Sequence, residues 1–176
     1  QTCALPISTF SLCCGALLTA LVCIMTMVIQ IPIPLGYAHL GDAMILLGVA
    51  YFGRREAVWA SGIGSSLADL LTGFTQWVIP TFFIKVIIVL IASQLMFDKE
   101  GGYRLWHPRN LFAAVLSMAW MVIGYVVVGS ILYGSIPAGL ASAPGLILEG
   151  VVNIAAYYAI AAALEKAHVR RLLHAE

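Results

Sequence analysis

Charged side chains are scarce in this sequence of 176 residues. Asp, Glu, Lys and Arg make up 10% of it, whereas soluble domains carry about a quarter, and 62% of the residues are hydrophobic. A chain this short cannot bury so much apolar surface within itself, because small domains leave a large share of their surface exposed. The composition therefore excludes a soluble globular domain and predicts a protein embedded in a lipid bilayer.

A basic excess, cysteine motifs and histidine pairs are missing too. The formal net charge is +1, which excludes the basic footprint of a nucleic-acid-binding protein. Cys3, Cys13, Cys14 and Cys23 show neither zinc-ligand spacing nor a disulfide framework, so we expect them to pack as small apolar residues. No two histidines stand four residues apart as a helical metal-binding pair, so no metal site is predicted. The sequence indicates no cofactor.

The first eight residues, QTCALPIS, lack an initiating Met and resemble a translated sequencing adapter more than a protein terminus. We interpret residues 1–8 as foreign and expect a single domain over residues 9–176. The first hydrophobic stretch has neither a basic leader nor a small-residue cleavage site before a soluble domain. It is therefore predicted to be a membrane span and not a signal peptide.

Six hydrophobic segments are long enough to be helices in a bilayer, whose core takes roughly 20 apolar residues to cross, or fewer where protein shields a helix end. Breaks rich in Gly, Pro or charge separate the segments. The sequence therefore predicts an all-α membrane protein with six transmembrane helices. They are expected at about 10–30, 40–53, 56–73, 79–97, 110–133 and 144–166.

Lysine and arginine are distributed unevenly among the connections. They lie between the second and third segments, between the fourth and fifth, and after the sixth, whereas the connections 31–39, 72–80 and 133–145 contain none. Cytoplasmic loops of membrane proteins carry an excess of Lys and Arg. Both termini are therefore predicted to be cytoplasmic.

Four ionisable residues remain inside the predicted spans: Asp42, Asp69, Lys85 and Glu149. Inserting one such charge at mid-membrane costs about 2.5–3.5 kcal/mol, so each residue needs a partner or a polar cavity. All four lie near the outer ends of their helices. We therefore predict a polar pocket that opens outward, rather than a charged path across the membrane.

Simpler roles stay open for these residues. Asp69 and Lys85 can form an ion pair that fastens two helices, and such a pair can still line a pocket. Asp42 can cap the start of its helix, where its charge suits the helix dipole. Glu149 has no second lysine to pair with and most invites a ligand, with Asn153 one turn further along the same helix face.

Aromatic residues surround the same outer region. Trp and Tyr at membrane edges commonly form an interfacial belt, and that role stays open for each of them. Together with the polar cluster they can form a stacking pocket for a flat ring. His39 is a loop residue that can add a hydrogen bond. The aromatic set is Tyr37, Phe74, Trp77, Phe82 and Tyr133.

Small residues recur at four-residue spacing in two segments. Ala16 and Ala20 form such a pair in the first segment, and Gly64 and Ala68 form one in the third. Faces of this kind let helices approach closely in lipid. They indicate either packing within the bundle or docking to another membrane subunit.

Three pieces of sequence, HLGDA at 39–43, GSSLADLLTGF at 64–74 and PTFFIK at 80–85, resemble the S components of energy-coupling factor (ECF) vitamin transporters. The similarity is greatest to the branch for hydroxymethylpyrimidine, pyridoxine and related small rings. The resemblance implies an S-component-like bundle of six helices in a prokaryotic plasma membrane, without an ATPase of its own. Such a chain captures a vitamin from outside and works with a membrane coupling subunit and two cytoplasmic ATPases.

The resemblance also implies roles for particular residues. In the family an Ala-x-x-x-Ala motif on the first helix docks onto the coupling subunit, and Ala16 and Ala20 match it. The family's substrate lies near the outer helix ends, beneath the Pro-rich connection at 31–37. Together with the aromatic cluster, this implies a substrate site formed by Tyr37, His39, Gly41, Asp42, Asp69, Trp77, Lys85, Glu149 and Asn153. Three acids against one lysine favour a neutral or weakly basic ring over a polyanion.

Two other classes of protein compete with this interpretation. Asp69, Lys85 and Glu149 can serve as a proton relay in a stand-alone proton-coupled secondary transporter of a small polar ring compound, although inverted repeats and broken helices are missing. An intramembrane enzyme would use hydrolase residue types such as Ser65, Ser66, His39 and Asp69, but no Gly-x-Ser-x-Gly elbow accompanies them. We therefore predict a substrate-binding subunit and not an enzyme.

Overall fold

The computed structural model describes residues 9–97 and 102–167. Within these ranges the chain forms six α-helices, a 3-10 turn and two three-residue strands, so the all-helical prediction is confirmed. Residues 1–8, interpreted as foreign, lie outside the described residues. The elements are α1 (Thr9–Val28), β1 (Ile31–Ile33), β2 (Gly36–Ala38), α2 (Gly41–Phe52), α3 (Arg54–Leu71), η1 (Thr75–Trp77), α4 (Val78–Met96), α5 (Pro108–Leu132) and α6 (Ile136–Lys166).

Four of the described helical segments are long and apolar enough to cross a membrane: α1, η1 with α4, α5 and α6. The sequence predicts six such spans, but α2 is a shorter apolar helix and α3 is not among the four. Their outward faces carry large exposed apolar side chains, among them Leu17, Phe83, Val127 and Leu148. Such a surface is unfavourable in water and suits lipid. The helical bundle is therefore built as a multi-pass membrane protein.

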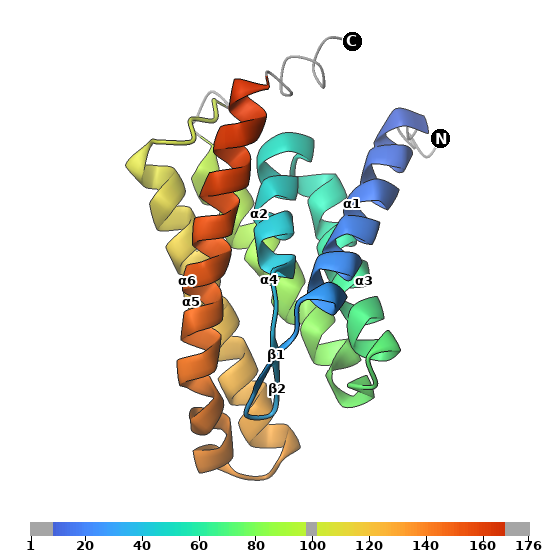
Figure 1. The fold of residues 1–176 in the computed structure, drawn as a ribbon, viewed down its shortest axis with the longest axis vertical. Helices are drawn as coiled ribbons and strands as arrows, with labels where there is room; N and C mark the ends of the chain where they lie inside the picture. Colours follow the sequence, from blue (N-terminus) through green and yellow to red (C-terminus); the bar gives the residue numbers. More distant parts are fainter. Residues whose placement is uncertain (1–8, 98–101, 168–176) are drawn as a thin grey trace, which may run out of the picture.

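α2 lies at the centre of the bundle (Figure 1), where it contacts α1, α3, α4 and α6. Its 12 residues extend over about 18 Å, too short to cross the hydrocarbon core. Eleven of the 12 are buried, which is the pattern of a helix that is apolar on all sides and enclosed by protein. The start of α2, with Asp42 in its first turn, is therefore held in the protein interior.

The sixth helix starts earlier than the sequence predicts. α6 begins at Ile136 rather than near 144, and Pro144 lies inside it. Gly and Pro in YGSIPAGLASAPG favour a loop in sequence-based prediction. Pro137 stands in the first turn, where its missing N–H is harmless, and the Ser135 hydroxyl caps the helix by accepting from the Ala138 N–H. The two added turns extend one wall of the cavity described below.

β1 and β2 pair in antiparallel fashion and form a short hairpin between α1 and α2. Leu35 at its tip has a φ of 69°, a left-handed conformation that a branched side chain rarely adopts. The hairpin packs closely on α5 and α6. A Cβ atom built on Gly129 would lie 3.2 Å from the Leu35 side chain, and one built on Gly145 would lie 2.6 Å from Ile33. Glycine at both positions lets the hairpin sit against these helices.

α1 begins and α6 ends at the same end of the bundle, whereas the hairpin extends toward the other end (Figure 1). The connection from α2 to α3, which carries Arg54 and Arg55, lies at the end that α1 and α6 share. That this end faces the cytoplasm stays a prediction from the loop charges.

The small residues of α3 serve packing within the bundle. A Cβ atom on Gly64 would lie 2.7 Å from the backbone carbonyl oxygen of Thr19 in α1, and one on Gly62 would lie 2.6 Å from Phe82 in α4. Of the two roles that the sequence left open for the stripe on α3, the structure shows the internal one. Ala16 and Ala20 on α1 are exposed instead.

Replacing Gly64 by Ala should destabilise the protein, because the new methyl group forces α1 away from α3. We expect the free energy of unfolding to fall by about 1–3 kcal/mol, as for other overpacked sites. Gly15→Ala is the matched control, since a Cβ atom there meets nothing within 4 Å. Thermal unfolding of the detergent-solubilised proteins measures both, and equal stability of the two variants would contradict this account of the α1–α3 contact.

Candidate functional site

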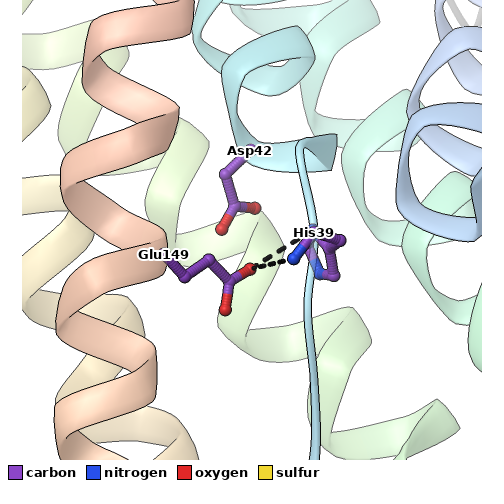
Figure 2. A group of neighbouring side chains, drawn as sticks. All are labelled: His39, Asp42 and Glu149. Atoms are coloured by element: carbon purple, nitrogen blue, oxygen red, sulfur yellow. Dashed lines mark hydrogen bonds and ion pairs between the residues drawn. The ribbon is translucent and has the colours of Figure 1, made fainter. Parts of the chain in front are cut away.

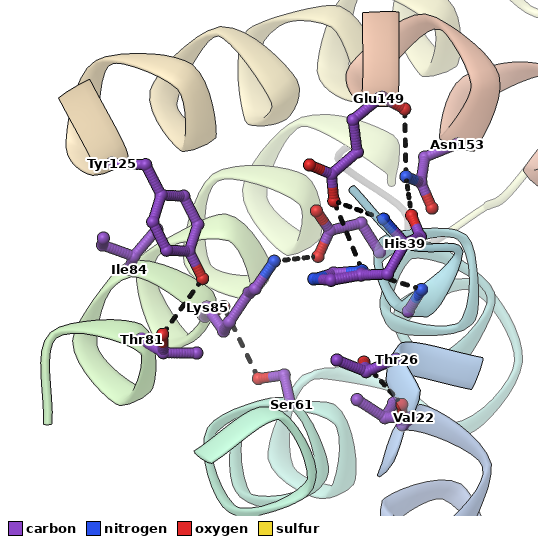
Figure 3. Close-up of polar contacts among 12 residues, drawn as sticks. Val22, Thr26, His39, Ser61, Thr81, Ile84, Lys85, Tyr125, Glu149 and Asn153 are labelled. Carbon is purple, nitrogen blue, oxygen red and sulfur yellow. Dashed lines mark hydrogen bonds and ion pairs between the residues drawn. The ribbon is translucent and has the colours of Figure 1, made fainter. Parts of the chain in front are cut away.

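Lys85 and Asp42 form an ion pair inside the bundle. Lys85 Nζ lies 2.6 Å from Asp42 Oδ1, and both side chains are fully buried. Nζ also lies 5.2 Å from the centre of the Tyr125 ring, whose face attracts a cation. Asp42 stands in the first turn of α2, where the helix dipole favours a negative charge. Figure 3 shows Lys85 of α4 between Tyr125 of α5 and the segment that leads into α2.

The sequence offered a different partner for this lysine. A pair between Asp69 and Lys85 would fasten α3 to α4, but the Asp69 carboxylate instead accepts a hydrogen bond from the Tyr37 hydroxyl at 2.9 Å. The central position of α2 brings Asp42 to Lys85. Asp42 does not cap α2 by a hydrogen bond either, since no side-chain cap is formed at this helix start.

Asn153 of α6 holds the start of α2 in place. Its Oδ1 accepts from the Ala43 N–H at 2.8 Å, while Nδ2 donates to the carbonyl oxygens of His39 at 2.7 Å and Glu149 at 3.0 Å. The Gly41 N–H donates to His39 Nδ1 at 3.1 Å. Two amides at the α2 start are thereby satisfied by side chains from outside the helix. Because Asn153 is fully occupied within the protein, its part is to position α2.

Glu149 and His39 meet at the same point (Figure 2). Glu149 Oε1 accepts from the His39 backbone N–H at 3.3 Å and lies 3.3 Å from Nδ1 of the ring. Burial lowers the pKa of His39 to about 3, and the Lys85 ammonium acts in the same direction. The imidazole is therefore neutral, and with Nδ1 accepting from Gly41 its proton is on Nε2.

One ligand atom from each of His39, Asp42 and Glu149 lies within 4.8 Å of the others. Such spacing would allow a metal ion. The Lys85 ammonium already contacts Asp42, however, and would repel a second cation bound at the same carboxylate. The cluster is better explained as a neutralised ion pair beside a hydrogen-bonded Glu149.

Tyr37 fastens the hairpin to α3. Its hydroxyl donates to Asp69 Oδ1 at 2.9 Å and lies 3.4 Å from the Thr72 hydroxyl, and its ring packs edge-on against Phe74 with 5.0 Å between centroids. Burial raises the pKa of Tyr37 well above its usual range, and the neighbouring Asp69 carboxylate raises it further. The phenol therefore stays protonated and remains a donor.

A cavity lies between the hairpin and the helices that surround it. The centre of a water-sized sphere can move through about 50 Å³ of it, which is room for a few water molecules and too little for a vitamin ring. Residues 33–37 of the hairpin form part of its wall. The lining consists of Ile33, Pro34, Leu35, Gly36, Tyr37, His39, Asp69, Phe74, Trp77, Thr81, Tyr125, Ser142, Leu146 and Glu149. The free space between the hairpin and the helices is therefore smaller than a vitamin ring.

The nine predicted site residues fall into two groups at this end of the bundle. Those that line the cavity are Tyr37, His39, Asp69, Trp77 and Glu149. Those that lie behind its wall, around the start of α2, are Gly41, Asp42, Lys85 and Asn153. Two members of the predicted aromatic set lie elsewhere: Phe82 packs against Gly62, and the Tyr133 hydroxyl accepts from Gln76 Nε2 at 3.4 Å.

Sequence reasoning missed several lining residues. Thr81 of α4 and Tyr125 of α5 both line the cavity, and the Tyr125 hydroxyl donates to Thr81 Oγ1 at 3.2 Å. Ser142 lies in the part of α6 that the sequence assigned to a loop. Neutral polar residues cost little in an apolar helix, so the sequence does not mark them as functional in the way that it marks a charged residue. The only signal available for these residues was their position near an outer helix end.

Breaking the buried ion pair from one side should destabilise the protein strongly. Lys85→Met leaves the Asp42 carboxylate buried without its cation, so we expect a loss of about 3–5 kcal/mol in unfolding free energy. Lys85→Met combined with Asp42→Asn removes both charges and should recover most of that loss. Thermal unfolding of the single and double variants measures the coupling, and additive losses would show that the two side chains do not act as a pair.

Comparison with known proteins identifies the family. Residues 6–166 match the family model described as "ECF-type riboflavin transporter, S component". A protein of Pyrococcus woesei named "Uncharacterized protein in gap 3'region" is 38% identical over 106 residues, covering 59% of this chain and 68% of that protein. The match confirms the resemblance to S components but does not support the branch for hydroxymethylpyrimidine and pyridoxine. The chain therefore belongs to the S components of ECF-type transporters, multi-pass membrane proteins that bind a substrate for uptake and are not enzymes.

Proposed function

We propose that this chain captures a small, flat-ring vitamin or vitamin precursor from outside the cell for an ATP-driven ECF importer. The observation that carries the proposal is the cavity beneath the hairpin. It combines two carboxyl groups, Asp69 and Glu149, with the aromatic rings of Tyr37, Trp77 and Tyr125. Aromatic faces hold a flat ring, and a few convergent polar groups fix its orientation.

The charges around the cavity favour an uncharged or weakly basic ligand. Lys85 is engaged by Asp42 and does not line the cavity, and His39, which does, is neutral, so Asp69 and Glu149 have no cationic side chain among the lining residues. A polyanion would be repelled. Hydroxymethylpyrimidine and pyridoxine fit this description and require a small displacement of the hairpin. Riboflavin is also an uncharged flat ring system, so the family label agrees on ring chemistry and differs on size.

Within this proposal the nine site residues have two kinds of role. The lining residues contact the ligand, whereas Gly41, Asp42, Lys85 and Asn153 hold α2 and the base of the hairpin behind them. Gly41 is required by space, because a side chain there would collide with Thr26 Oγ1 of α1. The second group therefore acts on binding through the shape of the site.

Energy for uptake is proposed to come from a membrane coupling subunit and two cytoplasmic ATPases, with both termini of this chain in the cytoplasm of a prokaryotic cell. Ala16 and Ala20 are the proposed docking face. Both are exposed on α1, and their small side chains let a partner helix approach closely. The alanines are not used by the bundle itself, in contrast to the small residues of α3.

The distribution of ionisable groups supports an importer with separate ATPases over a stand-alone proton-coupled transporter. Among the described residues, the buried acids and Lys85 gather at the hairpin end of the helices. Toward the other end the buried polar residues are uncharged: the Tyr103 and Tyr157 hydroxyls lie 2.7 Å apart, and Tyr157 donates to Asn110 Oδ1 at 3.0 Å. A proton relay would need titratable groups along the whole path.

Titration of the purified chain with hydroxymethylpyrimidine, pyridoxine and riboflavin tests the proposed ligand class. We expect saturable binding of at least one of them by calorimetry. Glu149→Gln should weaken it by about tenfold or more, because a lining carboxylate becomes a weaker acceptor. Glu165→Gln, an exposed glutamate on the same helix, should leave it unchanged. Absence of binding by all three ligands would reject the ligand class.

Replacing both Ala16 and Ala20 by Trp tests the docking face. The two bulky side chains should leave ligand binding intact but prevent assembly with the coupling subunit and abolish ATP-dependent uptake. The control is Leu17→Trp with Leu21→Trp, an exposed pair at the same spacing on an adjacent face of α1. Uptake at the normal rate by the alanine variant would refute the docking role.

A further inference from the structure

We infer that Asp69 Oδ2 and the Trp77 indole N–H act together as an acceptor and a donor that recognise one edge of the ligand ring, an edge that presents a hydrogen-bond donor beside an acceptor. This inference rests on the proposed function and names the chemistry of its substrate. An aminopyrimidine carries such an edge in its amino group and adjacent ring nitrogen. A flavin carries one in its ring N–H and adjacent carbonyl.

Two buried polar atoms on the cavity wall lack a partner. Asp69 is 7% exposed and Trp77 is 6% exposed, and both line the cavity. Among the described residues, Asp69 Oδ2 and Trp77 Nε1 are buried and make no hydrogen bond. Leaving such an atom unsatisfied costs about 1–3 kcal/mol, and the great majority of buried polar atoms are paired. An acceptor and a donor without partners, both on residues that line the same cavity, indicate that the ligand supplies their partners.

The groups around Asp69 are already engaged. Tyr37 donates to Oδ1, the other oxygen of the carboxylate. The Thr81 hydroxyl accepts from the Tyr125 hydroxyl at 3.2 Å, and Asp69 Oδ2 has no hydrogen-bond partner among the described residues. Lys85, the cation that the sequence offered to Asp69, is bound to Asp42 at 2.6 Å. The second oxygen of Asp69 is thus left for a donor that comes from outside the chain.

Trp77 is held in place while its N–H stays available. Its ring packs against Tyr125 with 5.4 Å between centroids, which fixes the indole on the wall. A Cβ atom built on Gly129 would lie 3.2 Å from the Leu35 side chain and 3.4 Å from the Trp77 ring, so the hairpin tip and the indole meet at the same point of α5. Leucine has no atom that can accept a hydrogen bond from the indole N–H.

The pair selects for chemistry as well as for shape. A ligand edge that carries only acceptors would leave Asp69 unpaired, and an anionic edge would be repelled by it. An edge that carries only donors would leave the Trp77 N–H unpaired. Two other buried atoms without partners, Asp42 Oδ2 and Ser65 Oγ, belong to residues that do not line the cavity and play no part in this selection.

Matched ligands and variants of the full-length purified chain test the assignment. The ligands are riboflavin and its N3-methyl derivative, and 4-amino-5-hydroxymethyl-2-methylpyrimidine and its 4-dimethylamino derivative. Methylation removes the donor and keeps the ring. For whichever unmethylated ligand binds the wild type, we expect its methylated derivative to bind roughly 10- to 100-fold more weakly. Whether riboflavin or the aminopyrimidine binds shows which kind of ring supplies the recognised edge.

Asp69 is tested in a background that spares the fold. Tyr37→Phe removes the internal donor to Asp69, and the penalty for ligand methylation should persist in it. The double variant Tyr37→Phe with Asp69→Leu replaces both partners of the internal hydrogen bond by apolar side chains, which is nearly neutral for stability. In this variant the loss of affinity on ligand methylation should vanish. Trp77→Phe, which keeps a ring but removes the N–H, should weaken the parent ligand by roughly tenfold.

The outcomes separate this inference from the proposed function. If a parent ligand binds the wild type but the methylation penalty survives removal of Asp69, or Trp77→Phe binds as tightly as the wild type, the recognition pair is wrong and the proposed function stands. If neither parent ligand binds the wild type, the recognition pair is wrong, and if pyridoxine does not bind either, the proposed function is overturned with it.

Discussion

A lysine buried beside an aspartate at the start of a central helix is the constraint on which this site depends. Two opposite charges in a low-dielectric interior are stable only when their geometry is good and their surroundings help. The α2 dipole and the Tyr125 ring supply that help to Asp42 and Lys85. Once α2 starts there, its first amides are satisfied by His39 and Asn153, and the chain before them is held against α6. The position of the hairpin, and hence of the cavity, follows from this arrangement.

The same ion pair decides the chemistry of the cavity. Because Lys85 is used to neutralise Asp42, it cannot neutralise Asp69 or Glu149, which face the cavity. A membrane interior makes such carboxyl groups expensive unless they serve a purpose. Binding a donor-bearing ring is a purpose that fits their position, their hydrogen bonds and the aromatic residues around them. Under the proposed function, structural and binding roles are divided between two neighbouring sets of polar residues.

Sequence reasoning succeeded where one strong energy term applies. Charges in lipid are so unfavourable that Asp42, Asp69, Lys85 and Glu149 indicate a polar centre from their depth along the chain alone. Their partners could not be predicted, because depth along a helix says nothing about which way it is rotated or which neighbour it faces. The assignment of residues 136–143 to a loop was wrong for a related reason. Proline disrupts a helix interior but is tolerated in the first turn, and the sequence alone does not show which of these positions it occupies.

The hairpin and the proposed ligand meet at one carboxylate. Asp69 holds Tyr37 through Oδ1, while Oδ2 is the atom inferred to hold the ligand. At its base, next to α2, the hairpin is secured by polar contacts from Asn153 and Glu149, whereas its tip rests on apolar contacts with α5 and α6. Apolar contacts are non-directional and tolerate displacement better than a hydrogen-bonded base does. Under the proposed function, the tip is therefore the part of the hairpin that we expect to move when a ring binds, while the polar contacts hold the base in place.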